Sequence, residues 1–147
     1  YTAAKIAVML NKTEKEIADT IASMESRGII VKYTAIVNDE RLSGDIVQAL
    51  IEVKVSPQKT SGFDAIAEEV YRFDEVKSCY LMSGGYDLAV FIEGKNLREV
   101  ARFVSERLST LDEVQSTATH FILKKYKIEG TITDTEDDNR IRISVHA

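Results

Sequence analysis

Ser83-Gly84-Gly85-Tyr86 is a glycine-rich element followed directly by the carboxylate of Asp87. Because the two glycines carry no side chain, a small ligand can approach backbone amides there, and a neighbouring carboxylate can hold an ammonium group. The competing interpretation is a tight turn in which glycine only permits positive φ. The element joins two predicted strands and does not lead into a helix, so it lacks the context of a dinucleotide or P-loop phosphate site.

A second candidate site is the polar face of a helix that the sequence predicts after Thr13. In Thr13-Glu14-Lys15-Glu16 the hydroxyl and the carboxylate can satisfy each other's backbone amides, which is a capping box. Ile17, Ile21 and Met24 follow at helical spacing and form the apolar face. The opposite face can enter a major groove and carries Thr13, Lys15, Glu16, Asp19, Thr20 and Ser23. The competing interpretation is a helix pair that only packs against its neighbour.

The residues that usually perform catalysis are sparse. His120 lies in a predicted strand and His146 near the end of the chain, and neither belongs to a metal or triad pattern. The lone Cys79 cannot form an internal disulfide or a cysteine metal cage. We therefore expect no enzyme activity, no cofactor and no metal.

Composition and charge bound the function further. The chain has 147 residues, 44% hydrophobic and 29% charged, which is typical of one or two small globular domains. No apolar run approaches the roughly 20 residues of a membrane helix, so we expect a cytoplasmic protein with no membrane partner. The net charge of −5 disfavours phosphate binding. The chain begins at Tyr1, inside a predicted helix start, and we expect its natural N-terminus upstream.

Residues 1–38 are predicted to form a small helical domain. Thr2 is a good N-cap for a helix over residues 3–10, and a turn of about three residues leads to the second helix, which should end at Gly28 in a left-handed cap. Residues 29–37 are β-branched and aromatic enough for a strand or ribbon. This segment is the only one with excess positive charge, five Lys/Arg against four Asp/Glu. The polar residues 39–45 are predicted to be a hinge.

Residues 46–126 alternate strands and helices in a different pattern. Apolar residues alternate along Val47–Val55, and helical spacing covers Phe63–Tyr71 and Leu97–Leu108. Further strands are predicted over Glu75–Met82, Asp87–Ile92 and Val114–Leu123. The order strand, helix, strand, strand, helix, strand predicts an α+β, ferredoxin-like domain, with both helices on one face of an antiparallel sheet.

The second face of that sheet should then lack a cover. We expect it to carry Leu50, Cys79, Leu81 and Phe121, which would be unfavourable in water and predicts at least a homodimer. The C-terminal extension, residues 127–147, has an acidic run over 134–139 between residues 131–133 and an alternating apolar stretch over 141–145. A small hairpin is predicted there, and a disordered tail is the alternative.

Two motifs, in this order and spacing, resemble the Lrp/AsnC (feast/famine) family of transcriptional regulators. Gly28-Ile29-Ile30-Val31-Lys32-Tyr33-Thr34-Ala35 is similar to the family's Gly-Val-Ile-x-x-Tyr-x-Ala run after the recognition helix. Ser83-Gly84-Gly85-Tyr86-Asp87-Leu88 is similar to its Gly-x-Tyr/Phe-Asp hairpin. The resemblance covers about residues 2–126.

The resemblance implies a partial winged helix-turn-helix joined to an effector domain of the RAM type. It implies double-stranded DNA as one partner and an amino-acid-like effector bound between subunits of a homodimer or a higher assembly such as an octamer. The implied effector residues are Gly84, Gly85, Tyr86 and Asp87, with Thr117 and Thr119 from a neighbouring subunit. Many members place Arg or Lys mid-way along the recognition helix, where this chain has Asp19, Thr20, Ala22 and Ser23. The alternative function is therefore an oligomeric metabolite sensor with weak or no DNA binding.

Overall fold

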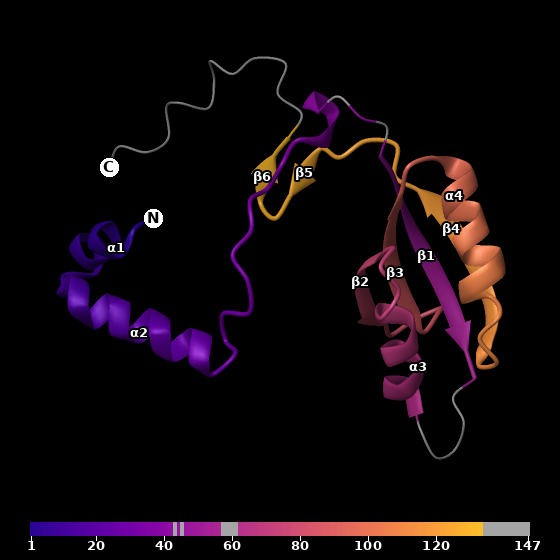
Figure 1. The fold of residues 1–147 in the computed structure, drawn as a ribbon, viewed down its shortest axis with the longest axis horizontal. Helices are drawn as coiled ribbons and strands as arrows, with labels where there is room; N and C mark the ends of the chain where they lie inside the picture. The colour runs from indigo at the N-terminus through magenta and orange to yellow at the C-terminus, as the bar shows by residue number, and fades with distance from the viewer. Residues whose placement is uncertain (43, 45, 57–61, 134–147) are drawn as a thin grey trace. The chain divides into compact units, whose positions relative to one another are not determined.

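The computed structural model describes residues 1–42, 44, 46–56 and 62–133. The chain divides into two compact units, Tyr1–Val37 and the part from Asn38 onward. Figure 1 traces the elements of both units along the chain.

The first unit contains helices α1 (Ala3–Leu10) and α2 (Glu14–Ser26), as the sequence predicts. The Thr2 hydroxyl caps α1, and Asn11, in a left-handed conformation, ends it. Gly28 follows α2 with φ of +68°, which confirms the predicted left-handed residue at its end. The helices pack through Ala7 and Ile17, both buried.

Residues 29–37 do not form the predicted strand, so that prediction is wrong. Ile29 and Ile30 instead both donate backbone hydrogen bonds to the Met24 carbonyl (2.8 and 3.2 Å), closing the end of α2. The β-branched composition favours an extended backbone, but a strand is held by a partner, and no described strand pairs with this segment. The Tyr33 hydroxyl donates to Glu25 (2.7 Å), and this bond raises the pKa of the Tyr33 phenol.

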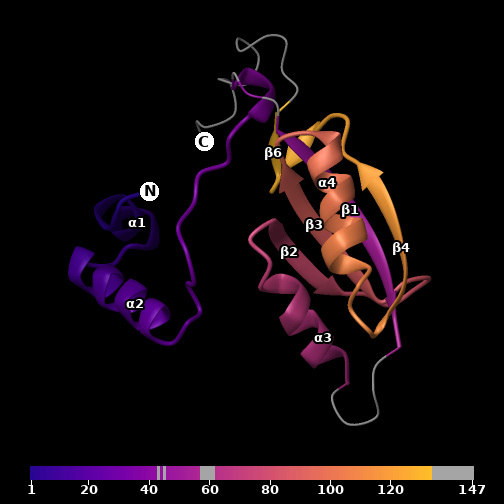
Figure 2. The same ribbon diagram turned by 45° about the vertical axis from the view of Figure 1, so that its right-hand side comes forward.

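The second unit is the predicted βαββαβ arrangement. Its four-stranded antiparallel sheet has the order β2-β3-β1-β4, with β1 Val47–Val55, β2 Val76–Leu81, β3 Leu88–Gly94 and β4 Val114–Phe121. Helix α3 (Gly62–Tyr71) follows β1. Helix α4 (Leu97–Phe103) follows β3 and ends in a wider π-helical turn over Val104–Leu108. Figure 2 shows β2 and β4 as the outer strands, with α3 and α4 over the sheet.

The hydrophobic core lies between the sheet and these two helices. It is built on alternate residues of the two central strands, among them Ile51, Val53, Val90 and Ile92, each at most 1% exposed. The helices cover them with a further set of buried side chains, namely Ile66, Val70, Val100, Phe103 and Leu108. The alternation predicted for β1 is thus confirmed, and it fixes the side of the sheet that the helices occupy.

The strand register corrects the expected composition of the other face. Cys79 pairs with Val90 and Leu81 with Leu88, and Phe121 pairs with Ala49, so all three lie on the helix side. A register shift between Val76 and Ser78 puts both Val76 and Cys79 on that side, which simple alternation along β2 does not reveal.

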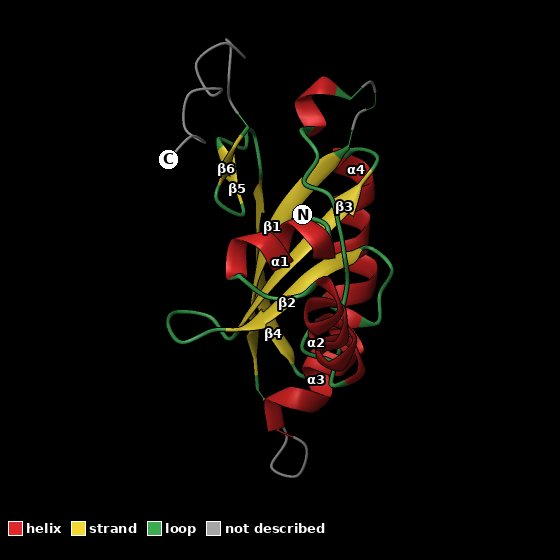
Figure 3. Ribbon diagram, turned by 90° about the vertical axis from the view of Figure 1, so that its left-hand side faces the viewer, coloured by secondary structure: helices red, strands yellow, loops and turns green. Residues whose placement is uncertain are grey.

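The face away from the helices, here called the open face, still carries apolar side chains. Leu50 is the one predicted residue on it, and Phe91 and Tyr80 lie near it, with their rings edge to face at 6.1 Å. Leu50 and Phe91 are half-buried and Tyr80 is 54% exposed. Figure 3 shows α3 and α4 on one side of the sheet and the C-terminal hairpin on the other.

Two short elements lie next to the sheet. A 3-10 helix, η1, covers Asp39–Arg41 within the predicted hinge. After β4, strands β5 (Lys127–Ile128) and β6 (Thr131–Ile132) form a hairpin whose turn, Glu129–Gly130, has positive φ at both residues. The acidic run and the alternating stretch that the sequence analysis placed in a hairpin lie outside the described residues.

Candidate functional site

The predicted nucleic-acid face of α2 consists of six exposed residues, but they are not equally available. The Thr13 hydroxyl accepts from the Glu16 backbone amide (3.2 Å), and the Glu16 carboxylate accepts from the Thr13 amide (2.8 Å). The Thr20 hydroxyl donates to the Glu16 carbonyl (2.7 Å). Three of the six therefore use their polar groups within the helix, which leaves Lys15, Asp19 and Ser23 as outward-facing groups.

The electrostatics of this face are nearly balanced. The pKa of Glu16 is lowered, first by the hydrogen bond from the Thr13 amide, then by the Thr13 hydroxyl, and then by the charge of Lys12. Lys12 lies 3.8 Å from Glu16 and is a cation next to the start of α2 that the sequence analysis did not include. On this face Lys15 and Lys12 thus offset Glu16 and Asp19, so the face presents no excess positive charge to phosphates.

The glycine hairpin between β2 and β3 is exposed and held to the end of β1. Gly84 has φ of +154°, a conformation that favours glycine, and a β-carbon at Gly84 or at Gly85 would meet no atom within 4 Å. The backbone amide of Asp87 donates to the Val53 carbonyl (3.0 Å), and its carboxylate accepts from the Val55 amide (2.9 Å). One oxygen of the carboxylate predicted to bind an ammonium group is therefore engaged with the backbone.

Thr117 and Thr119 lie on β4, in the same sheet as the two strands that the glycine hairpin joins. They pair with Val53 and Ile51, whose side chains are buried, so both threonines lie on the helix side. The Thr117 hydroxyl is 3.4 Å from that of Ser109, which follows the π-helical turn. Asp87 and Thr117 flank Val53 from opposite sides of β1, so within one chain the strand separates them.

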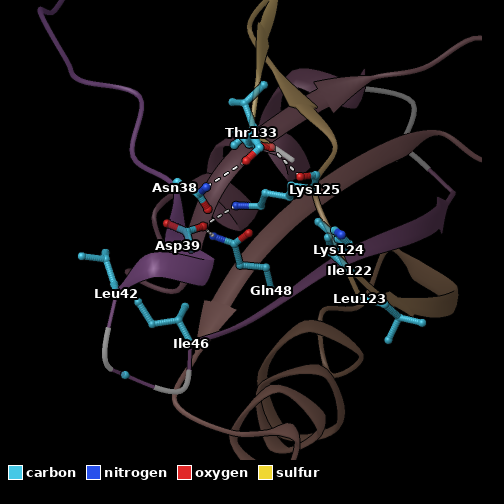
Figure 4. A pocket seen from close by; sticks show the side chains of 12 residues that line it. Asn38, Asp39, Leu42, Ile46, Gln48, Ile122, Leu123, Lys124, Lys125 and Thr133 are labelled. Atoms are coloured by element: carbon cyan, nitrogen blue, oxygen red, sulfur yellow. Dashed lines mark hydrogen bonds and ion pairs between the residues drawn. The ribbon is translucent and has the colours of Figure 1, made fainter. Parts of the chain in front are cut away.

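A pocket of about 360 Å³ lies at the other end of the sheet and was not predicted. It is lined by η1, the start of β1, the chain after β4 and the C-terminal hairpin. The Lys125 ammonium donates to the Asp39 carboxylate (2.6 Å), to which Gln48 also donates (3.4 Å). Figure 4 shows these three side chains directed toward one another. The pocket contains none of the predicted effector residues, and no local pattern indicates it because its ion pair joins residues 86 positions apart.

The same polar cluster connects several strands of the unit. The Gln48 amide also donates to Glu93 on β3 (2.6 Å), and Glu93 forms an ion pair with Lys77 on β2 (3.9 Å). The Asn38 amide donates to the Thr133 carbonyl (2.9 Å), so the residue where the chain enters this unit is bonded to the residue that follows the hairpin. The predicted hinge, residues 39–45, thus begins at Asp39, whose carboxylate is hydrogen-bonded to Gln48 and Lys125 of the sheet unit.

Among the described residues, no group of three or more His, Cys, Asp and Glu side chains could hold a metal ion. None of the helices described is long and apolar enough to cross a membrane. Burial raises the pKa of the Cys79 thiol, which disfavours the nucleophilic thiolate.

Comparison with known proteins agrees with this architecture. The profile of the Lrp/AsnC ligand-binding domain matches residues 48–132. The chain is 49% identical over 141 residues to the uncharacterized HTH-type transcriptional regulator YugG of Bacillus subtilis, covering 95% of this chain and 85% of that protein. It is 30% identical over 123 residues to the HTH-type transcriptional regulator FL11 of Pyrococcus furiosus, covering 84% of this chain and 78% of that protein.

Among solved structures, the transcriptional regulator NMB0573 of Neisseria meningitidis, in complex with L-Met, superposes with a TM-score of 0.69. It shares 22% identity and covers 90% of this chain and 84% of that one, which is a likeness of fold. A helix-turn-helix pair followed by a ferredoxin-like effector domain defines a class of transcriptional regulators, which are not enzymes. Within that class, the chain belongs to the Lrp/AsnC family.

Proposed function

We propose that this chain binds double-stranded DNA and that an amino acid or related metabolite, bound between subunits, controls that binding. The observation that carries the effector part is the exposed pair Gly84 and Gly85, held in place by the bonds between Asp87 and β1. The L-Met complex of the Neisseria meningitidis protein supports an amino acid as the ligand class. The effector would shift the population of assemblies and so the arrangement of their DNA-binding helices.

The DNA-binding part is tested with Lys15→Glu. Lys15 is exposed on the outward face of α2, so the charge reversal should weaken binding by a similar factor across DNA sequences, since phosphate contacts carry little base information. The measurement is a gel shift at low salt with the upstream region of the protein's own gene. Lys95→Glu makes the same charge change at an exposed position in the second unit and should leave binding unchanged. An equal loss in both variants would remove α2 from the proposal.

The effector part is tested with Gly85→Val. No atom lies within 4 Å of the added β-carbon and the backbone at Gly85 is not left-handed, so the variant should fold while its side chain covers the hairpin amides. A thermal-shift screen of the twenty amino acids should identify ligands that stabilise the parent, and Gly85→Val and Gly84→Val should lose that stabilisation. An unchanged response in both variants would exclude the hairpin as the effector site.

The alternative function is a metabolite-sensing oligomer with weak or no DNA binding. Two observations favour this alternative, because both weaken attraction to phosphates. Lys15 is the single cation among the six residues of the α2 face, and the acidic Asp19 lies on the same face. Avidity in a multimer can offset weak individual contacts. An absence of any gel shift by the parent at low salt, together with an intact ligand response, would decide for this alternative.

A further inference from the structure

The pocket next to η1 combines an ion pair with an apolar wall. Leu42 and Ile46 line it from the segment before β1, and Ile122 and Ile128 line it from the chain after β4. Its polar lining includes Asp39, Gln48 and Lys125, which contact one another, together with Asn38, Thr133 and a second lysine, Lys124. The Lys124 ammonium lies over the Tyr126 ring, 5.2 Å from its centroid. Its volume of about 360 Å³ is near the lower end of the range for small-molecule pockets, roughly 300–1,000 Å³, which suits a small metabolite.

Contacts to a ligand can replace the ion pair between Asp39 and Lys125 at little cost in stability. The Asp39 and Lys125 side chains are 36% and 28% exposed, so water screens their attraction and the pair contributes little to stability. Lys125 has three donors and Asp39 accepts one of them. Both described bonds to Asp39 go to Oδ2, from Lys125 and from Gln48. The second carboxylate oxygen and the remaining ammonium donors can therefore serve a ligand.

The charges also select the class of ligand. An anion alone would bind Lys125 beside the negative charge of Asp39, and a cation alone would have the reverse conflict. A zwitterion satisfies both groups at once, with its ammonium on Asp39 and its carboxylate on Lys125. The apolar wall then suits an aliphatic side chain, whose burial is favourable.

We propose that this pocket is a second small-molecule site, which binds an aliphatic zwitterion such as a branched-chain amino acid. The proposal goes beyond the proposed function, because it requires neither the glycine hairpin nor DNA binding. The site also includes the start of the second unit, since Asp39 is two residues after the boundary at Val37. A ligand that takes over the contacts of Asp39 would therefore change how the start of this unit is held to the sheet.

The test is an NMR titration of the full chain, labelled at isoleucine δ1 methyl groups, with L-leucine as the probe. Ile46, Ile122 and Ile128 line the pocket, whereas Ile51 and Ile66 are buried in the core and serve as internal references. We expect the three pocket signals to shift in the parent and equally in Gly85→Val, which blocks the hairpin. Isoamylamine lacks the carboxylate of leucine and 4-methylpentanoate lacks its ammonium group, and each should bind at least tenfold more weakly.

Lys125→Gln keeps much of the side-chain stem and removes its charge, so it should weaken leucine binding at least tenfold. Lys95→Gln is the matched control at an exposed position outside the pocket and should bind as the parent does. Unshifted pocket signals, or shifts that disappear in Gly85→Val, would overturn the proposal. So would equal binding of leucine and its two analogues by the parent, a comparison that holds even if Lys125→Gln fails to fold. None of these results depends on a gel shift, so failure here is distinct from failure of the proposed function.

Discussion

At the scale of single residues, Asp87 shows how one side chain can belong to both the fold and a candidate site. It follows the glycine hairpin, and its amide, carbonyl and carboxylate all form hydrogen bonds, to Val53, Met82 and Val55. The β1–β3 pairing ends at Val53, and the carboxylate continues it by one bond to the buried Val55. A ligand ammonium at the hairpin would therefore meet a carboxylate whose position is already fixed, which lowers the entropy lost on binding.

We predict that Asp87→Ala lowers the free energy of unfolding by about 1–3 kcal/mol, because the Val55 amide is left without its acceptor. Asp87→Asn retains an acceptor oxygen and should lose less. Urea unfolding followed by circular dichroism measures both, with Asp112→Ala as an exposed control. If Asp87→Ala is as stable as the parent, the hydrogen bond to β1 makes no net contribution.

At the scale of elements, α2 depends on its capping box for a defined start. Isolated helices of its length, 13 residues, are marginal in water, so the cap and the packing of Ile17 against α1 matter more than helix propensity. The lowered pKa of Glu16 means that its ionised form is favoured in the folded state. Its contribution is therefore complete above the ordinary value of 4.5 and is lost as the pH falls through the lowered one.

We predict that the helical circular dichroism signal of the parent falls on acidification below 4.5 by more than that of Glu16→Gln, which has no charge to lose at this position. The other carboxylates titrate in both proteins, so the difference between the two curves isolates Glu16. Parallel curves over the whole acid range would show that the capping box does not depend on the ionised form.

The elements that the sequence predicts correctly are those with local signals. Apolar spacing and the capping residues locate α1, α2 and β1, and the order of the remaining elements indicates the ferredoxin-like topology. The predictions that are wrong depend on neighbours. Residues 29–37 have strand composition but no described partner, and the register shift after Val76 changes which face Cys79 occupies.

The candidate sites also differ in whether their residues are consecutive in the sequence or distant from one another. The glycine hairpin is visible in the sequence because its residues are consecutive, and its position between β2 and β3 is confirmed. The bond of Asp87 to Val55 joins residues 32 positions apart, and the ion pair of Asp39 with Lys125 joins residues 86 positions apart. Such contacts arise only once the sheet has formed, so no local pattern predicts them.

At the scale of the whole molecule, the open face is the feature that favours assembly. Helices α3 and α4 cover the same side of the sheet, and Leu50, Phe91 and Tyr80 leave apolar surface on the other. Exposed apolar patches of this kind mark protein interaction sites. We propose that a second copy of the chain covers this face in a homodimer, and that dimers assemble further.

We predict that Leu50→Glu converts the dimer to a folded monomer, because the new carboxylate would be buried without a partner in the interface. Size-exclusion chromatography with light scattering at micromolar concentration measures the mass, and circular dichroism checks the fold. Leu97→Glu adds the same charge at an exposed apolar position on α4 and should leave the dimer intact. A parent that elutes as a monomer would contradict the proposed assembly.

The hydrogen bond from Asn38 to the Thr133 carbonyl has one more consequence. It brings the first residue of the sheet unit next to the last one described, so that the two ends of the described part of this unit are adjacent. Domains whose ends meet in this way tolerate transplantation into other chains. We therefore expect residues 38–133 to fold when they are inserted into a surface loop of a host protein, because adjacent ends do not force the two sides of that loop apart. A host that carries this insertion should report metabolite binding.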